Sequence, residues 1–535
     1  MPALTASSPR RLPNPAARSS AQPSTAPINP RLLHILLTPL VLLIHGYHPF
    51  AGDAGLYTAG LRHILHPALY PRNAAFVTAF THRSVFPWIL AGLVRLTHLP
   101  LAWILLATHL FSIWLFLVAA DSLAAHLFSS HSARIFATLL AAACCALPVA
   151  GTALVLMDPY VTARSFSTPL SLLAVAAALD TAKARRWPRT LLLLVLTLAI
   201  HPLMGVYATA FVLLLALTAA GRIRVAVILC AAAFLLAGTA VVVTHATPVD
   251  PAYRQAVSLA PRSFLFLARW RWYEVLGLLL PLALFALAFR RIGTHTPTGA
   301  LCLTSILLGT TALLIAACFV PPTGPFPLVP YQVLRTFHLI YCVGVILCGG
   351  VLARRVPHIS PFLADVRRPE SRPFIRLPSL QAALLVALFA AMFLVEQLDW
   401  PGGRRMELPG LAPTSPYTQA FLWIRTHTPP NAVFAFNPRL VYLPGEDEQG
   451  FRAISDRDQL ADDKDAGVAA VIPSLAPRWA AQRNAEISVD RMSDAERRAT
   501  LTPLGATWLL LPPTAATTLP CPYRNSAVEV CRLTP

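Results

Sequence analysis

The sequence predicts a mainly α-helical protein that crosses a membrane about eleven times and ends in a small α/β domain. Three observations lead to this fold class. Of all side chains, 56% are hydrophobic and only 13% are charged, about half the charged share of a typical soluble domain. Long apolar runs recur from Leu32 to Val395. After Trp400 the chain becomes polar, as expected for a separate soluble domain.

The net charge of +19 comes mainly from the N-terminal tail and from short loops between apolar runs. Basic loops mark the cytoplasmic side of a membrane protein, so this pattern needs no nucleic-acid partner, and none is expected. Only Lys183 and Lys464 are lysines, and every other cationic side chain is an arginine. This bias is associated with GC-rich bacterial genomes, so we expect a multi-pass protein of the bacterial cytoplasmic membrane.

The loop charges give the order of the predicted spans. Residues 1–31 contain no acid and are rich in Pro, Ser, Ala and Arg, which predicts a disordered cytoplasmic tail. Basic clusters at 183–186, 221–224, 290–291 and 354–376 are also assigned to the cytoplasm. The membrane domain, residues 32–398, then contains spans near 32–46, 101–120, 134–156, 167–182, 190–201, 203–220, 223–244, 273–289, 299–319, 336–353 and 379–397. This odd number places residues 399–535 outside the cytoplasm.

Several segments between these spans are not ordinary connectors. The long outer loop 47–100 contains Phe86–His98, which we interpret as an interfacial or re-entrant helix because counting it as a crossing breaks the charge parity. His201-Pro202 predicts either a tight turn or a kinked helix. The outer loop 245–272 mixes arginines with aromatic residues, and the outer loop 320–335 has too many prolines to be helical throughout.

The C-terminal region predicts a small extracytoplasmic α/β domain. Residues 417–428 have the pattern of an amphipathic helix, and strands are expected at 432–436, 506–511 and 528–533 with an acidic, helical middle. Cys521 and Cys531 are predicted to form a disulfide that closes a loop between two short strands. Such a bond needs an oxidising compartment, which agrees with the predicted topology. The alternative is two unpaired thiols in a small core.

Two aspartates are the candidate catalytic residues. The first 398 residues contain only nine acidic side chains, and a carboxylate at bilayer depth costs about 2.5–3.5 kcal/mol. Asp53 follows the first span and could act as a general base toward a hydroxyl group. Asp158 ends the third predicted span on the same side of the membrane. The alternative for each aspartate is a helix cap.

Candidate substrate-binding residues surround these two aspartates in the predicted topology. Arg164 could pair with Asp158 or hold a phosphate, since arginine matches phosphate oxygens with two parallel hydrogen bonds. The basic and aromatic loop suits an anionic lipid headgroup, with the alternative of nonspecific lipid contacts. No zinc signature is present, so no metal site is expected. The residues assigned to substrate binding are His48, Tyr57, Arg164, Arg254, Arg262, Arg269 and Arg335.

The order of these parts resembles the GT-C superfamily of integral-membrane glycosyltransferases, such as protein mannosyltransferases and lipid A aminoarabinose transferases. Asp53 matches the family's catalytic acid in the first outer loop. The run Leu156-Met157-Asp158-Pro159-Tyr160 is similar to the family's second motif, and 421–429 looks like the helix that opens the outer domain. Many members carry two acids in the first loop, whereas Asp53 stands alone in Gly-Asp-Ala-Gly.

The resemblance implies sugar transfer from a polyprenyl-phosphate donor to an acceptor at the outer face, with membrane lipids as further partners. No cofactor is expected, and a divalent cation at Asp53 stays an open alternative. A transporter or lipid flippase is the second hypothesis, because the broken helix at His201-Pro202 and a basic cavity would suit transport. A non-catalytic scaffold for envelope assembly is the third.

Overall fold

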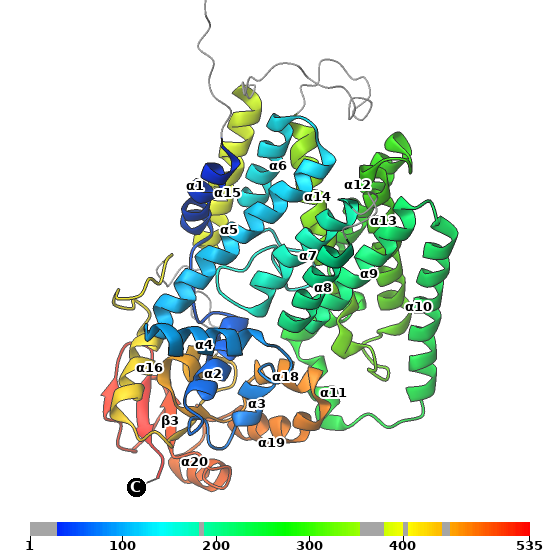
Figure 1. The fold of residues 1–535 in the computed structure, drawn as a ribbon. Coiled ribbons are helices and arrows are strands. Elements are labelled where there is room, and N and C mark those ends of the chain that lie inside the picture. Colours follow the sequence, from blue (N-terminus) through cyan, green and yellow to red (C-terminus); the bar gives the residue numbers. More distant parts are fainter. Residues whose placement is uncertain (1–28, 181–186, 354–378, 400–404, 441–449, 535) are drawn as a thin grey trace, which may run out of the picture.

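The computed structural model describes residues 29–180, 187–353, 379–399, 405–440 and 450–534. The chain forms a helical bundle with the C-terminal domain packed against one end, next to three short helices (Figure 1). Residues 1–28 of the predicted tail and the predicted cytoplasmic clusters 183–186 and 354–376 lie outside the described residues.

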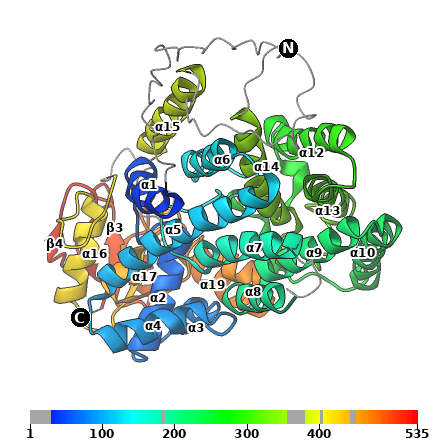
Figure 2. The same ribbon diagram turned by 45° about the horizontal axis from the view of Figure 1, so that its top comes forward.

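The helical bundle consists of long helices that run roughly parallel to one another (Figure 1). In chain order they are α1 (Pro30–His45), α5 (Leu101–Leu127), α6 (His131–Ala143), α7 (Ala163–Asp180), α8 (Trp187–Ile200), α9 (Pro202–Ala219), α10 (Ile223–Thr244), α12 (Trp272–Ile292), α13 (Pro297–Phe319), α14 (Phe337–Leu352) and α15 (Ser379–Asp399). Helix α15 packs at the edge of the bundle against α1 and α6 (Figure 2).

Several of these helices are apolar enough to identify a membrane protein. Within the described residues, six helical stretches have the length and composition to cross a bilayer. The most apolar windows of α10 and α12 are only 11% buried inside the protein. Apolar surface of this extent is unstable in water, so these helices face lipid. The six stretches are Leu101–Leu127, Pro202–Ala219, Ile223–Thr244, Trp272–Ile292, Pro297–Phe319 and Val329–Leu352.

The predicted helical span at 134–156 is wrong in its second half. Helix α6 ends at Ala143, and residues 144–162 form an irregular segment with a bridge between Pro148 and Val155. Pro148 explains the end of the helix, because its ring would clash with the carbonyl of residue 144 and it has no N–H to donate. This segment carries Asp158 back toward the start of α7.

The break at His201-Pro202 is a tight turn, one of the two predicted alternatives. His201 has extended backbone angles, and Pro202 begins α9 at the first helical position, where proline is favoured. Helices α8 and α9 then pack against each other. The predicted helix at Phe86–His98 is also present, as α4 (Phe86–Thr97).

The C-terminal domain is built on a five-stranded sheet with the order β2-β1-β3-β5-β4. Strands β1 and β3 cover the core of two predicted strands, β5 covers the third, and α16 matches the predicted amphipathic helix. Cys521 and Cys531 form the predicted disulfide. The strands are β1 (Val433–Ala435), β2 (Asp458–Gln459), β3 (Trp508–Leu511), β4 (Tyr523–Arg524) and β5 (Glu529–Arg532). The helices are α16 (Pro416–His427), α17 (Gly450–Ser455), α18 (Asp465–Val471), α19 (Ala476–Glu486) and α20 (Asp494–Leu501).

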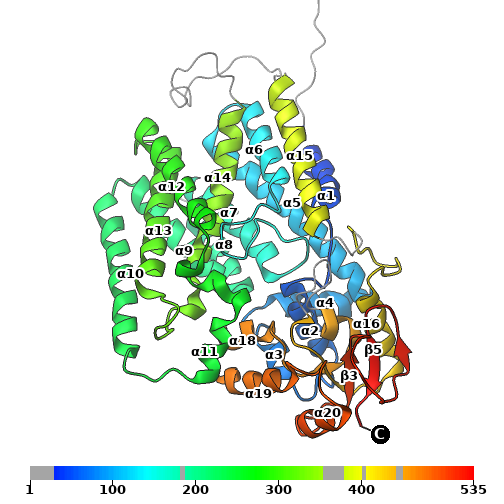
Figure 3. The same ribbon diagram turned by 180° about the vertical axis from the view of Figure 1, so that it is seen from behind.

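A shared hydrophobic core joins the C-terminal domain to the end of the bundle. It combines apolar side chains from α2 (Asp53–Leu65), α3 (Ala74–Thr78) and α11 (Pro251–Ser258) with side chains from α18 and α19. Figure 3 shows α11 beside α18 at this junction. Because buried apolar area is the main stabilising contribution, the domain is docked against the bundle.

Polar contacts fix the same junction. The backbone amides of Arg72 and Asn73, which precede α3, donate to Asp458 Oδ2 at 2.8 and 3.0 Å. Arg62 of α2 pairs with Asp456 at 3.0 Å. These buried hydrogen bonds and ion pairs set the orientation of the domain relative to α2, and α2 carries Asp53 at its first residue.

Candidate functional site

Asp53 is positioned by a turn that only glycine fits. Gly52 has φ +54°, and a Cβ built there would lie 2.5 Å from the Tyr160 hydroxyl. Gly52 is the N-cap of α2 and Asp53 is its first helical residue. The alternative of Asp53 as the N-cap is therefore wrong, and its carboxylate instead pairs with two cations.

Asp158 is held in the irregular segment by contacts from two other elements. His338 of α14 hydrogen-bonds through Nε2 to the carbonyl of Leu156 at 3.1 Å. The backbone amide of His48 donates to the carbonyl of Pro159 at 2.9 Å. Helix α7 begins only at Ala163, so Asp158 does not cap it. Residues on both sides of Asp158 are therefore anchored.

Arg164 joins the two aspartates. Its Nη2 and Nε donate to Asp158 Oδ2 at 2.7 and 3.1 Å, and its Nη1 lies 3.7 Å from Asp53 Oδ2. The side chains of Arg164 and Asp158 are 6% and 5% exposed, whereas that of Asp53 is 36% exposed. Asp158 therefore fixes the guanidinium, and Asp53 is the carboxylate that a ligand can reach.

Lys464 of the C-terminal domain completes this group, although it is not among the site residues predicted from the sequence. Its Nζ lies 2.9 Å from Asp53 Oδ1. The available signal was its rarity, since it is one of two lysines and stands alone among the acids of Asp462-Asp463-Lys464-Asp465. Sequence patterns do not show that this turn reaches α2, because the contact depends on how the domain docks.

Arg335 is the third cation near Asp53. It lies in the short helix η5 (Val333–Thr336), and its guanidinium is 5.0 Å from the ring centroid of Phe264. It acts electrostatically on Asp53, Arg164 and Asp158. Its Nε is buried and has no hydrogen-bond partner in the part of the chain that the structure describes. A buried guanidinium nitrogen without an acceptor favours binding of an anion.

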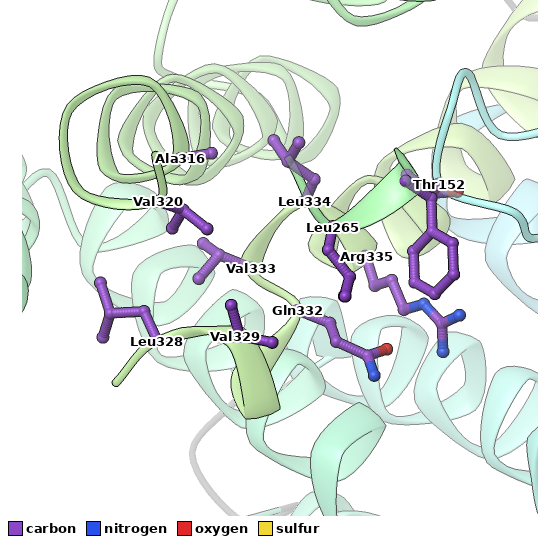
Figure 4. Close-up of a pocket in the computed structure, with 11 residues that line it drawn as sticks. Thr152, Leu265, Ala316, Val320, Leu328, Val329, Gln332, Val333, Leu334 and Arg335 are labelled. Carbon is purple, nitrogen blue, oxygen red and sulfur yellow. The ribbon is translucent and has the colours of Figure 1, made fainter. Parts of the chain in front are cut away.

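Two pockets meet at Arg335. The first is a small cavity of about 10 Å³, with Val320, Leu328 and Val333 on one side and the polar ends of Gln332 and Arg335 on the other (Figure 4). The second, also of about 10 Å³, lies between α7, α9 and α14. Five of its lining residues carry hydroxyl groups, which donate to backbone carbonyls, and most of its surface is apolar. The residues that line it are Ser167, Thr168, Ser171, Met204, Tyr207, Arg335, Thr336, His338 and Leu339.

The charges around Asp53 determine its protonation state. Burial opposes its charged form, but Lys464, Arg164 and Arg335 outweigh burial and hold the pKa of Asp53 below its ordinary value. Asp53 is therefore ionised at neutral pH. While Lys464 is paired with it, this carboxylate is a weak base, since a general base works best with a pKa near the working pH.

The remaining predicted site residues take different positions. Tyr57 lies one turn after Asp53 on α2, within electrostatic reach of Asp53 and Arg164, and its ring stacks on Phe80 at 5.4 Å. His48 is buried and faces Glu407, with Nδ1 3.9 Å from Oε1. The structure therefore brings Tyr57 into the charged group and directs the His48 side chain toward Glu407.

The three arginines of the loop at 245–272 that were predicted to bind substrate do not act as one group. Arg262 is partly buried and donates to the carbonyls of Asp463 and Lys464 at 3.2 and 3.0 Å, so it supports the Lys464 turn. Arg269 is exposed and donates to the carbonyl of Ser258. Arg254 is exposed on α11, and its side chain has no hydrogen bond or ion pair with the described residues.

Metal ligands are not gathered at Asp53. Within the described residues, the one group of three His, Cys, Asp or Glu side chains with ligand atoms close enough to share a metal ion is Cys521, Glu529 and Cys531. The two sulfur atoms of that group are joined in the disulfide. At the candidate site, Asp53 and Asp158 are paired with Arg164 and Lys464.

The fold and the site define a helical membrane protein with a charged site between its bundle and its C-terminal domain. Neither protein-family models nor curated proteins match this sequence. The geometry of the site is therefore the basis for assigning a function.

Proposed function

We propose that this protein is a GT-C-type membrane glycosyltransferase that transfers a sugar from a polyprenyl-phosphate donor to an acceptor hydroxyl. One observation carries the proposal: an accessible carboxylate, Asp53, shares Arg164 with the buried Asp158, next to pockets that meet at Arg335. Asp53 and Asp158 stand where the GT-C resemblance expects acids.

The proposed topology places this site at the outer face of the bacterial cytoplasmic membrane. The eleven bundle helices of the described residues are assigned as eleven crossings, with residues 144–162 completing the crossing that α6 begins. The C-terminal domain then lies outside the cytoplasm. The Cys521–Cys531 disulfide supports this side, because disulfides persist in oxidising compartments.

The proposed chemistry is a displacement at the anomeric carbon of the donor sugar. The acceptor oxygen bonds to this carbon while its proton passes to the Asp53 carboxylate. The bond from the anomeric carbon to the phosphate oxygen breaks, and the electron pair leaves with the polyprenyl phosphate. Arg335 and Arg164 stabilise the negative charge that develops on this leaving group.

The linings of the two pockets match the chemistry of the two parts of such a donor, and each pocket must widen to admit its part, because about 10 Å³ holds only one water molecule. The pocket with Val320, Leu328 and Val333 offers apolar surface to the first part of a polyprenyl chain. The second pocket offers hydroxyl oxygens to a sugar as hydrogen-bond acceptors, since their protons are donated to backbone carbonyls. Because Arg335 lines both, it lies where the phosphate connects the lipid to the sugar.

The experiment follows the fate of labelled polyprenyl-phosphate sugars in liposomes that contain the purified full chain. A glycosyltransferase releases polyprenyl phosphate, whereas a flippase moves the intact lipid across the bilayer. We expect Asp53→Asn to slow release at least about 100-fold, and Asp158→Asn to slow it because Arg164 loses its anchor. Arg491→Gln, which removes an exposed charge of the C-terminal domain, is the matched control and should keep the parental rate.

Two results would contradict this function. The first is release by both aspartate variants at the parental rate. The second is movement of the intact lipid without release of polyprenyl phosphate for any donor sugar in the panel.

A further inference from the structure

The turn that carries Lys464 is fixed on every side. Asp462 Oδ1 accepts hydrogen bonds from the amides of Lys464 and Asp465, each at 2.9 Å. Asp465 pairs with Arg452 at 2.8 and 3.0 Å. These side chains, apart from Lys464 itself, are buried. The turn therefore holds the Lys464 backbone still while leaving its ammonium at the site.

Further contacts tie this turn to the rest of the domain and to the bundle. Asp463 pairs with Arg483 at 2.8 Å, and Trp479 donates to the carbonyl of Asp462 at 2.7 Å. From the bundle side, Arg262 donates to the Lys464 carbonyl. The Lys464 side chain is 17% exposed. A flexible ammonium on a rigid backbone can exchange one anion for another without moving the domain.

The charges at the site do not cancel. Lys464, Arg164 and Arg335 act together on Asp53, and Asp158 is the second carboxylate among the described residues of this group. Three cations thus face two carboxylates, which leaves one positive charge without a carboxylate partner. The unsatisfied Nε of Arg335 marks where that surplus lies. An anionic ligand would neutralise the surplus charge and give the Arg335 Nε a hydrogen-bond acceptor.

We propose that Lys464 is a further substrate-binding residue, whose ammonium moves from Asp53 to the phosphate of a bound lipid-linked donor. The proposal rests on the proposed function for the identity of the donor, and it assigns the C-terminal domain a direct part in binding. One movement has two effects. The phosphate gains a cation, and Asp53 loses the neighbour that most strongly suppresses its basicity. No covalent bond changes in this exchange.

Amine labelling tests the proposal directly, because Lys464 is one of only two lysines in the chain. The full chain in phosphatidylcholine nanodiscs is treated with an acetylating N-hydroxysuccinimide ester, and the modification rates of both lysines are read by mass spectrometry. Lys183 is the internal reference. Asp53→Asn should raise the rate at Lys464 roughly 10-fold, since a charge-assisted contact is lost. Adding undecaprenyl phosphate to Asp53→Asn should restore the protection.

Two further conditions of the same experiment distinguish a polyprenyl phosphate from free phosphate and from the phosphate of a phospholipid headgroup. Inorganic phosphate at equal concentration, and nanodiscs containing phosphatidylglycerol, should each give little protection. Equal protection by either would overturn the assignment to a polyprenyl phosphate. No protection by undecaprenyl phosphate, in a variant that still binds it, would overturn the proposal itself.

Affinity measurements give a second readout that does not depend on sugar transfer. Lys464→Gln should weaken binding of undecaprenyl phosphate by roughly 10-fold to 100-fold, and Lys464→Arg should retain most of the affinity. Arg491→Gln is the matched control, because it removes one exposed charge from the same domain. Equal affinities of Lys464→Gln and the parent would overturn the proposal. If Lys464→Gln loses affinity but no sugar is transferred, the binding role stands and the proposed function fails.

Discussion

Lys464 and Asp53 form an ion pair of 2.9 Å between the C-terminal domain and the first residue of α2. This contact joins two parts of the chain that lie more than 400 residues apart. It makes the candidate site a product of domain docking, since neither the bundle nor the C-terminal domain contains all of its charges.

The pairing of Asp158 with Arg164 predicts unequal effects of neutralising the two aspartates. Asp158→Asn leaves the buried Arg164 without its closest carboxylate, and removing one partner of a buried pair costs about 3–5 kcal/mol of stability. Asp53→Asn should cost less, because its side chain is partly exposed to solvent. Thermal unfolding with a thiol-reactive dye measures both, because the free thiols of Cys145 and Cys342 are buried. A larger loss of stability in Asp53→Asn than in Asp158→Asn would contradict this prediction.

The acids beside Lys464 predict a dependence of domain stability on pH. Burial and the nearby Asp465 raise the pKa of Asp462 to about 7, against an ordinary value of 3.8. Between these two values the unfolded chain releases a proton that the folded domain keeps. Stability therefore falls as pH rises from about 4 to about 7, and this contribution stays constant beyond that window.

Substitution of the Asp462 carboxyl group by an amide tests whether Asp462 causes the decrease in stability with rising pH. Asp462→Asn should flatten the decrease and make the domain more stable than the parent at pH 8, as measured by pulse proteolysis of the full chain in urea. Asp490→Asn, which changes another carboxyl group of the domain and leaves Asp462 intact, is the control. A parental pH dependence in Asp462→Asn would show that another group is responsible.

The disulfide predicts a local loss of stability when both cysteines are replaced. Cys521 and Cys531 are ten positions apart, and closing a loop of this length stabilises a domain by about 2.5 kcal/mol in the chain-entropy model. The double variant Cys521→Ala/Cys531→Ala should lower the stability of the C-terminal domain by about this amount in urea. Cys318→Ala/Cys348→Ala removes two exposed free thiols and should leave it unchanged.

The hydrogen bonds of Arg262 are expected to stabilise the turn that carries Lys464. Arg262→Gln removes the donors to the carbonyls of Asp463 and Lys464, so the turn should loosen and amine labelling of Lys464 should accelerate. Arg269→Gln is the matched control, because Arg269 donates to the Ser258 carbonyl, away from the turn. If both variants label Lys464 at the parental rate, Arg262 does not support the turn.

The sequence was informative where local patterns decide the structure. Apolar runs located the long helices, and short strand-like runs in the polar C-terminal region located β1, β3 and β5. The helical span at 134–156 failed because its composition stays apolar through Pro148, while proline geometry ends the helix. Strands β2 and β4 were not predicted, since two residues each carry too little pattern.

The site was only partly accessible to sequence analysis. Scarcity of acids in an apolar chain pointed to Asp53 and Asp158, and the structure shows that Arg164 joins them. The loop arginines looked equivalent in sequence, yet Arg262 is a structural donor and Arg254 is exposed. Lys464 could not be predicted, because sequence periodicity carries no information about which turn of a docked domain contacts α2.

The most direct test of the shared site is a cryo-EM reconstruction of the full chain in a lipid nanodisc with undecaprenyl phosphate. This account predicts phosphate density between Arg164, Arg335 and Lys464, with Asp53 and Asp158 on either side of the Arg164 guanidinium. Phosphate density elsewhere in the protein, or Asp53 and Asp158 bound to separate partners in different pockets, would contradict it.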